Sequence, residues 1–262
     1  MSKRLQSVSN IWLTGASSGI GAALVRQLAS EGHNLIISGR RQHALDELAQ
    51  HWPTQISTAV ADTTSREELA AIADNLNHFG DLDMAILNAG TCEYLEIADY
   101  DSSVIEANLT TNLLGTARSL DIALPALRAT RAKGKPATLV IVSSSAWWFP
   151  FSRAEGYGAS KAGLTYFAQA LRADLAAEGI EVVVVSPGFV KTPLTDRNDF
   201  PMPFLVTAEE AAHRISAGLT KGKNEIAFPR RFTWLLKALG ALPQGLIDRM
   251  AAAMARSSDQ NV

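Results

Sequence analysis

Short apolar runs alternate along this chain with longer segments in which apolar residues recur at helical spacing. The short runs are almost uninterrupted, which is typical of strands buried on both faces of a sheet. They predict strands at residues 11–13, 35–38, 56–60, 84–87, 138–142 and 182–185. The longer segments predict helices at residues 20–30, 42–50, 66–77, 103–131 and 157–178.

Strand, helix and strand in repeated succession predict a parallel sheet with helices on both faces. The chain has 262 residues, which suits one large domain of this kind. We therefore expect the α/β class: a single doubly wound domain over residues 1–262, with a parallel sheet of about seven strands. Ligands of such sheets bind beyond the carboxyl ends of the strands. The residues that follow each strand are therefore the first candidates for a site.

A glycine-rich turn joins the first expected strand to the first expected helix. Gly15 suits a tight turn, Gly19 lets a diphosphate approach bare backbone, and Gly21 lets the helix pack close to the sheet. The start of the helix offers unpaired N–H groups and a partial positive charge. Ser17 and Ser18 add hydroxyl donors. A glycine-rich turn without a ligand is the alternative, but its place in the alternation favours a nucleotide site.

Two arginines follow the second expected strand. An acidic residue at this point usually binds the ribose hydroxyls of NAD, whereas arginine accommodates the 2′-phosphate of NADP. Here Gly39, Arg40 and Arg41 occupy the position and no carboxylate does. NADP(H) is therefore the expected cofactor. The alternative is that both arginines only begin a solvated helix.

Tyr157 and Lys161 are four residues apart, so both side chains lie on one face of the expected helix. A nearby ammonium favours the phenolate, and Tyr157 could then exchange a proton with a substrate oxygen. The pair alone is weak evidence, because it arises readily by chance. Ser144 ends the fifth strand and either bonds the substrate or caps the strand. Asn112 lies inside a long expected helix and has either a polar task or a solvent-facing position.

In this order the motifs resemble those of the short-chain dehydrogenase/reductase family, over nearly the whole chain. The family patterns T-G-x-x-x-G-x-G, N-A-G, Y-x-A-S-K and P-G-x-x-x-T match residues 14–21, 88–90, 157–161 and 187–192. Ser144 lies thirteen residues before Tyr157, which is the usual spacing in the family. One departure is Leu87, which stands before N-A-G where asparagine is commoner.

The resemblance implies a Rossmann-type fold and a role for each motif residue. Tyr157 would be the general acid/base, and Lys161 would lower its pKa and bind the nicotinamide ribose. Ser144 would position the substrate oxygen, and Asn112 would hold a water in a relay to Lys161. Asp62 would lie near the adenine. The implied cofactor-binding residues are Gly15, Ser17, Ser18, Gly19, Ile20, Gly21, Arg40, Arg41, Asp62, Asn88, Ala89, Gly90, Tyr157, Lys161, Pro187, Gly188, Val190 and Thr192.

We therefore expect an NADP(H)-dependent oxidoreductase, a carbonyl reductase or alcohol dehydrogenase. It would transfer a hydride between the nicotinamide and a small apolar carbonyl or alcohol. A non-redox reaction on the same fold and a catalytically idle NADP(H)-sensing or scaffold protein are the alternatives. The presence of all four implied catalytic residues favours hydride transfer.

Two regions are expected on the substrate side. Trp147, Trp148 and Phe149 follow Ser144 and either wall an apolar pocket or pack on the protein or at a subunit contact. The family resemblance also implies that residues 193–222 form a lid region that closes over substrate.

The C-terminal arm, residues 229–262, mixes arginines with Trp and Leu. It either packs on the core or on a partner subunit, which we favour, or lies on a membrane surface. The family resemblance also implies a homodimer or homotetramer, paired through the two long helices.

Several classes of function are disfavoured. A net charge of −2 provides no basic field for nucleic acid. Cys92 is the single cysteine, so no internal disulfide forms, and the five histidines are scattered, so no metal site is expected. Neither a signal peptide nor a membrane-spanning run is apparent, and a cytoplasmic location is expected.

Overall fold

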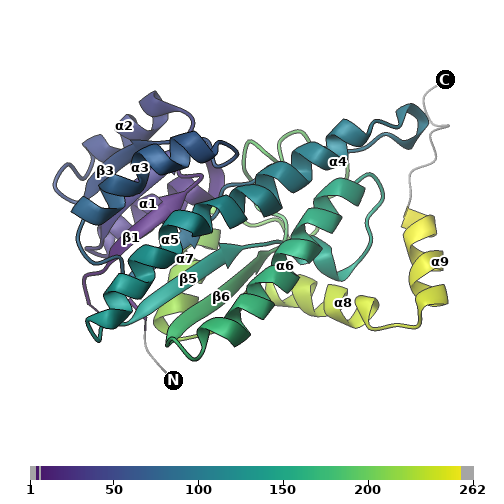
Figure 1. Ribbon diagram of the computed structural model, residues 1–262. Coiled ribbons are helices and arrows are strands. Elements are labelled where there is room, and N and C mark those ends of the chain that lie inside the picture. Colours follow the sequence, from purple (N-terminus) through teal and green to yellow (C-terminus); the bar gives the residue numbers. More distant parts are fainter. Residues whose placement is uncertain (1–3, 6, 255–262) are drawn as a thin grey trace.

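The fold is built on one sheet of seven parallel strands in the order β3-β2-β1-β4-β5-β6-β7 (Figure 1). The computed structural model describes residues 4, 5 and 7–254. The strands are β1 (Asn10–Thr14), β2 (Asn34–Gly39), β3 (Ile56–Val60), β4 (Met84–Leu87), β5 (Ala137–Val142), β6 (Ile180–Pro187) and β7 (Glu225–Phe228). The predicted α/β class and parallel seven-stranded sheet are confirmed.

Helices cover both faces of the sheet (Figure 1). They are α1 (Gly19–Ser30), α2 (Gln42–Gln50), α3 (Arg66–His78), α4 (Ser102–Leu109), α5 (Gly115–Ala132), α6 (Glu155–Leu175), α7 (Ala208–Thr220), α8 (Arg230–Gly240) and α9 (Gln244–Met254). Apolar residues of α1, α2 and α7 form one core against the sheet, and those of α3, α5 and α6 form the other. The architecture is therefore a three-layer, doubly wound domain.

Successive strand residues contribute to opposite cores, because side chains alternate across a strand. Ile11 and Leu13 of β1 lie in the core beneath α1, whereas Trp12 between them lies in the core beneath α3. All six residues of β5 are buried. Burial on both faces explains why the strands appear in the sequence as continuous apolar runs.

The chain order reverses between β1 and β4, which are neighbours in the sheet. From β1 the chain winds outward to β3, and then returns to β4 and winds toward β7. Loops on the two sides of this switch point diverge and leave a crevice at the carboxyl ends of the strands. The switch point therefore fixes where a ligand site can form.

Several elements differ in detail from their predicted bounds. The helix expected at residues 103–131 contains a π-helical turn at Thr110–Leu114, between α4 and α5. Ser65 caps the start of α3, where its side chain accepts a hydrogen bond from the Glu68 N–H. The second half of the expected lid region is α7, whose apolar face packs into the core.

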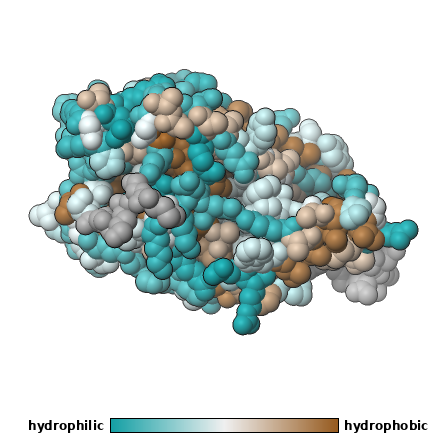
Figure 2. Space-filling view, turned by 90° about the horizontal axis from the view of Figure 1, so that it is seen from below, coloured by the Kyte–Doolittle hydropathy of each residue, from teal (hydrophilic) through white to brown (hydrophobic). Residues whose placement is uncertain are grey.

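The C-terminal arm contains α8 and α9, and its residues 255–262 lie outside the described part of the chain. Phe232 and Leu236 of α8 and Ile247 of α9 are buried with Phe149. Trp234 and Leu235 of α8 face outward, and apolar residues gather at this end of the molecule (Figure 2). No described helix is both long and apolar enough to span a bilayer.

Candidate active site

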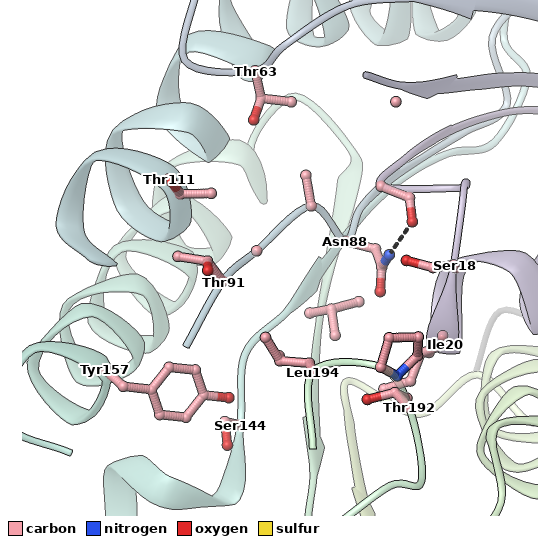
Figure 3. A pocket seen from close by; sticks show the side chains of 18 of the residues that line it. Ser18, Ile20, Thr63, Asn88, Thr91, Thr111, Ser144, Tyr157, Thr192 and Leu194 are labelled. Carbon is pink, nitrogen blue, oxygen red and sulfur yellow. Dashed lines mark hydrogen bonds between the residues drawn. The ribbon is translucent and has the colours of Figure 1, made fainter. Parts of the chain in front are cut away.

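A cavity of about 610 Å³ opens at the carboxyl ends of the strands. The glycine-rich turn and the end of β2 line one part of it, and Ser144, Tyr157 and Lys161 line another. Residues 88–91 after β4 and residues 187–195 after β6 lie between these two parts (Figure 3). Residues from distant segments of the chain therefore meet in one cleft.

The glycine-rich turn packs so tightly that side chains do not fit in it. Gly15 has a φ of +69°, and a Cβ atom added there would lie 2.7 Å from the Cα of Ala89. A Cβ atom on Gly21 would lie 2.1 Å from the Gly15 carbonyl oxygen. The Ser18 side chain makes no capping bond at the start of α1. The first N–H groups of α1 are thus offered to the cleft, as anion binding requires.

Asn88 holds the loop after β4 against the glycine-rich turn. Its Nδ2 donates to the carbonyl oxygens of Thr14 and Gly15 at 3.1 and 3.2 Å (Figure 3). Its own N–H and that of Ala89 donate to Thr14 Oγ1. These bonds fix the two sides of the switch point relative to each other.

The two arginines after β2 differ in their surroundings. Arg40 lines the cleft, is 79% exposed, and has Nη1 4.0 Å from an Asp62 carboxylate oxygen. Arg41 donates from Nη2 to the Ser17 carbonyl oxygen at 2.8 Å. Arg40 is thus free to move toward an anion in the cleft, while Arg41 is hydrogen-bonded to the glycine-rich turn.

Tyr157 and Lys161 lie in the first turns of α6, which brings them to the end of β5. Lys161 is buried, and its Nζ donates to the Val142 carbonyl oxygen at 3.1 Å and lies 5.8 Å from the Tyr157 ring centroid. The Tyr157 hydroxyl points toward Ser144 (Figure 3). Ser144 Oγ accepts a hydrogen bond from the Ala146 N–H at 3.1 Å. The side chains of Tyr157, Lys161 and Ser144 therefore meet where the sequence predicts.

Burial controls the protonation of this group. Burial raises the pKa of the Tyr157 phenol. The nearby Cys92 raises this pKa further, and the hydrogen bond with Ser144 lowers it. Burial also lowers the pKa of Lys161, to about 8. The sequence predicts a lowered Tyr157 pKa, and this structure gives the opposite direction. The reason is that burial keeps the phenolate from being solvated by water, and this is the largest contribution to the pKa of Tyr157.

Asn112 is fully buried at the π-helical turn, and each polar atom of its amide is paired. Its Oδ1 accepts from the Thr91 N–H at 2.8 Å, and its Nδ2 donates to the Thr91 carbonyl oxygen at 3.0 Å and to Ser160 Oγ at 2.8 Å. Ser160 Oγ in turn donates to the Tyr157 carbonyl oxygen at 2.7 Å. Asn112 thus links the loop after β4 to the backbone of the Tyr157 turn. The solvent-facing alternative for Asn112 is excluded.

Gly90 lies between Asn112 and Lys161. A Cβ atom on Gly90 would lie 2.9 Å from Asn112 Oδ1 and 3.5 Å from Lys161 Nζ. A side chain at residue 90 would therefore require Asn112 to shift, whereas its distance to Lys161 would be an ordinary contact.

Sequence comparison gives the family. The profile of the short chain dehydrogenase family matches residues 9–200. An uncharacterized oxidoreductase of Myxococcus xanthus is 32% identical over 247 residues, which are 91% of this chain and 94% of that protein. The chain belongs to the short-chain dehydrogenase/reductase family. It is therefore an oxidoreductase whose fold implies a nicotinamide dinucleotide cofactor, NAD(H) or NADP(H).

Other short-chain dehydrogenases support this placement. The 11-beta-hydroxysteroid dehydrogenase 1A of Arabidopsis thaliana is 33% identical over 196 residues, covering 72% of this chain and 54% of that protein. A short chain dehydrogenase of Burkholderia cenocepacia in complex with NADP has the same fold, with a TM-score of 0.81 and 23% identity. The match covers 94% of this chain and 98% of that one.

The aromatic stretch after Ser144 lies outside the cleft of this short-chain dehydrogenase. Trp147 and Trp148 line a separate groove of about 560 Å³ against α6 and α9, together with Phe149. Phe149 is buried against α8 and α9. Packing on the protein itself is therefore favoured for Phe149 and Trp148, which belong to the cluster of α8 and α9, whereas Trp147 lines the groove.

Sequence reasoning overlooked three residues near the site of this short-chain dehydrogenase. Ser160 bridges Asn112 and Tyr157, and its place inside Y-x-A-S-K was the available signal. Cys92 and Tyr94 lie close enough to Tyr157 to affect its environment. Nothing in the sequence indicates these last two, since they come from a loop without a motif. Among the described residues, no cluster of His, Cys, Asp and Glu could hold a metal ion.

The lowered pKa of Lys161 predicts a pH-dependent stability. The pKa of Lys161 is about 8 in the folded protein, whereas its ordinary value, which applies to the unfolded chain, is 10.5. Between these values the unfolded chain binds more protons, so the free energy of unfolding rises with pH, by about 2 kcal/mol from pH 8 to pH 10. Below pH 8 this contribution is constant.

The measurement is urea unfolding of the wild type and of Lys161→Met across this range. The difference between the two proteins is the readout, because Cys92 and Tyr157 have raised pKa values and destabilise both proteins at high pH. A difference that stays flat with pH would show that the pKa of Lys161 is not lowered.

Proposed function

We propose that this protein is an NADP(H)-dependent carbonyl reductase or alcohol dehydrogenase that acts on a small apolar substrate. The observation that carries the proposal is the meeting of Tyr157, Ser144 and Lys161 at one part of a cleft whose other part is a bare glycine-rich turn. The glycine-rich turn can bind a diphosphate, and the side chains of Tyr157, Ser144 and Lys161 can bind a reacting oxygen. One cleft that holds both features suits a molecule that carries a diphosphate and a reactive ring.

The residues of the cleft fit a nicotinamide dinucleotide. Gly15, Gly19 and Gly21 present backbone where side chains would block a diphosphate. Asp62 lines the adenine part of the cleft, and Pro187, Gly188, Val190 and Thr192 line the part nearest β6. Ser17, Ser18, Ile20, Asn88, Ala89 and Gly90 complete the same lining. When bound, the nicotinamide supplies or accepts the hydride.

Tyr157 carries the proton in the proposed reaction. Burial raises the pKa of its phenol, which keeps Tyr157 protonated at neutral pH. A protonated phenol beside Ser144 is suited to donate its proton to a carbonyl oxygen during reduction. Ser144 Oγ would hold that oxygen by a second hydrogen bond and so fix its distance to Tyr157.

Lys161 and Asn112 support the proton transfer through their effects on Tyr157. A charged Lys161 stabilises the phenolate left on Tyr157 and would bond the nicotinamide ribose. Its pKa of about 8 keeps most of the side chain charged at neutral pH. Asn112 holds Thr91 and Ser160, and through Ser160 the carbonyl of Tyr157. The water relay implied for Asn112 stays a prediction, because both polar atoms of its amide are bonded to Thr91 and Ser160.

The preference for NADP(H) rests on Arg40. Its guanidinium lies at the cleft end beside β2, is largely exposed, and is only weakly held by Asp62. A guanidinium binds a 2′-phosphate as a bidentate fork. Solved structures of the same fold carry either cofactor: a 3-ketoacyl-(acyl-carrier-protein) reductase of Brucella melitensis, 22% identical, is complexed with NADH. The preference for NADP(H) over NAD(H) is therefore assigned to Arg40 and not to the fold.

Replacing Arg40 by alanine is expected to weaken NADPH binding by about 10- to 100-fold, because a charge-assisted bidentate contact to phosphate is lost. NADH binding should change by less than about twofold. Fluorescence titration of both cofactors measures this. Arg26→Ala, which removes an exposed arginine of α1, is the control. An equal loss for both cofactors would refute the phosphate contact.

A homodimer or homotetramer is part of the same proposal. The outer surfaces of the long helices carry exposed apolar side chains, with Leu114 at the π-helical turn 45% exposed and Tyr166 of α6 76% exposed. Pairing of these helices between subunits would cover them. Sedimentation equilibrium of the purified protein tests this, and a monomer at micromolar concentration would contradict it.

The experiment that tests the proposed reaction is NADPH oxidation with a panel of ketones, aldehydes and quinones. Selective NADPH binding with turnover of an apolar carbonyl would support the proposal. Selective binding without any turnover would favour the alternative of an NADP(H) sensor. Failure to bind either dinucleotide would refute the proposal.

A further inference from the structure

The two faces of helix α8 have different surroundings. Its inner face is apolar and buried, because Phe232 and Leu236 pack in a cluster with residues of α9. Its outer face also carries large apolar side chains, but Trp234 is 66% exposed and Leu235 is 50% exposed. A surface helix of a globular protein ordinarily carries polar residues on the face opposite the core. The outer face of α8 therefore needs a separate explanation.

Helical spacing brings five exposed residues to the outer face of α8. They are Arg230, Arg231, Trp234, Leu235 and Ala238. The two arginines lie in the first turn of the helix, and the two large apolar side chains lie in the next turn. We call these five residues the basic apolar face. A cationic end beside aromatic and aliphatic side chains is typical of helices that lie in the interface of a membrane.

The stability of the helix does not explain the two arginines. The N-terminus of a helix carries a partial positive charge, so cations in its first turn are unfavourable. No acidic residue lies in the first turn of α8, and the N-cap residue Pro229 makes no capping bond. Within the described part of the chain, no carboxylate pairs with the side chain of Arg230 or Arg231. Lys237, by contrast, pairs with Glu225. The two arginines are therefore available to an anion from outside.

The C-terminal arm differs in charge from the rest of the chain. Residues 229–254 include four cationic residues and one acidic residue, a net charge of +3, whereas the whole chain carries −2. The acidic residue, Asp248, accepts a hydrogen bond from Gln244 of its own helix. Leu246 at the start of α9 and Arg249 one turn later are both exposed. Apolar side chains gather at this end of the molecule (Figure 2), which is therefore both cationic and apolar.

We propose that the basic apolar face of α8, together with the start of α9, docks the protein on the surface of a membrane that contains anionic lipids. The arginines bind lipid phosphates, and Trp234 and Leu235 enter the boundary between headgroups and acyl chains. Each of the two helices has 11 residues, which is too short to cross a bilayer but sufficient to lie on it. The inference goes beyond the proposed function, because no residue of this face lines the cleft.

A second copy of the chain is the main alternative occupant of this face. In a twofold pair the same surface of each copy meets the other. The arginines of one copy would then lie near those of its partner, and like charges in contact are unfavourable. An anionic lipid surface offers the opposite charge and an apolar layer together. Charge complementarity therefore favours the membrane over self-association.

The first test is co-sedimentation of the whole chain with lipid vesicles. One set of vesicles contains equal parts of phosphatidylglycerol and phosphatidylcholine, and the other contains phosphatidylcholine alone. We expect binding to be at least about tenfold tighter to the anionic set. About 0.5 M NaCl should remove most of this difference, because salt screens exposed charges. Equal binding to both sets, or binding to neither, would overturn the proposal.

Two double variants test the charged and the apolar parts of the face separately. Arg230→Gln/Arg231→Gln removes the charges, and Trp234→Ser/Leu235→Ser removes the large apolar side chains. All four side chains are exposed, so both variants should keep the urea unfolding midpoint of the wild type. Each variant should weaken binding to the anionic vesicles by roughly tenfold or more, because it removes either the attraction to phosphate or the buried apolar area.

The matched controls make the same kinds of change elsewhere. Arg26→Gln/Lys221→Gln removes two exposed cations, one from α1 and one just after α7. Val8→Ser removes an exposed apolar side chain ahead of β1. Both controls should bind the anionic vesicles within about threefold of the wild type. If they lose as much binding as the variants of α8, attachment is not specific to the basic apolar face and the proposal fails.

Trp234 also reports which face meets the lipid. In the wild type, anionic vesicles should move the tryptophan emission to shorter wavelengths, because this indole leaves water. Trp234→Phe keeps an aromatic ring, so it should bind within about threefold of the wild type but lose the wavelength shift. A shift that persists in Trp234→Phe would place another face against the lipid and overturn the assignment.

Sedimentation velocity without lipid tests the alternative of a second copy. The Trp234→Ser/Leu235→Ser variant should have the same association state as the wild type. If it dissociates while its binding to vesicles is unchanged, the face is a contact between copies and the membrane proposal fails. None of these measurements uses turnover, so failure of the proposed reaction and failure of membrane docking are distinguishable.

Discussion

Tyr157→Phe is expected to reduce turnover by at least about 1,000-fold while leaving NADPH binding within about twofold of the wild type. The phenol oxygen is the only group of Tyr157 that changes, and it is the group that faces Ser144 (Figure 3). Without it the proposed proton donor of the reaction is lost. The ring remains, so the surface that faces Lys161 is unchanged. Single-turnover kinetics with NADPH separates the chemical step from cofactor binding.

The matched control is Tyr166→Phe. Tyr166 lies on the same helix α6 but is 76% exposed, so loss of its hydroxyl tests the general effect of this change on the helix. Its turnover should stay within about twofold of the wild type. Retained turnover in Tyr157→Phe would remove Tyr157 from the proposed role. Lost turnover in both variants would point to a disturbed α6 instead of a lost acid.

The sheet and the motif residues were predictable because they depend on short-range patterns. Continuous apolar runs identify strands that are buried on both faces, and glycines mark the turn where β1 meets α1. The parallel arrangement then places every strand end at one edge of the sheet. Ser144 and Tyr157 meet for this reason, since one follows β5 and the other begins the helix that returns along it.

Contacts between distant segments were not predictable from the sequence. Tyr94 and Asn198 are 104 residues apart and lie in loops without a periodic pattern, so no local signal pairs them. The sequence leaves two alternatives for Trp147 to Phe149, a wall of the substrate pocket or packing on the protein, because it does not show on which side of α6 the loop folds. In the structure Phe149 and Trp148 pack with residues of α8 and α9. The pKa of Tyr157 was mispredicted for a similar reason: its direction depends on how deeply the whole fold buries the phenol.

Gly90→Ala is expected to lower kcat by roughly 100-fold and the free energy of unfolding by about 2 kcal/mol. The added methyl group would lie 2.9 Å from Asn112 Oδ1 and 3.5 Å from Lys161 Nζ. Asn112 cannot yield easily, because it is fully buried and its amide is held by Thr91 and Ser160. Its displacement would break those bonds and move the Tyr157 turn. Urea unfolding and initial rates measure the two effects.

Gly158→Ala is the control for this change, since it adds the same methyl group one residue after Tyr157. A Cβ atom there has no neighbour within 4 Å, so alanine should stabilise α6 by about 0.5–1 kcal/mol and preserve turnover. Opposite effects of one methyl group at two glycines would attribute the loss at Gly90 to contact with Asn112 and Lys161. If Gly90→Ala instead turned over normally, the space between these two side chains would not be needed for proton transfer. The support that Asn112 gives to Tyr157 would then be structural only.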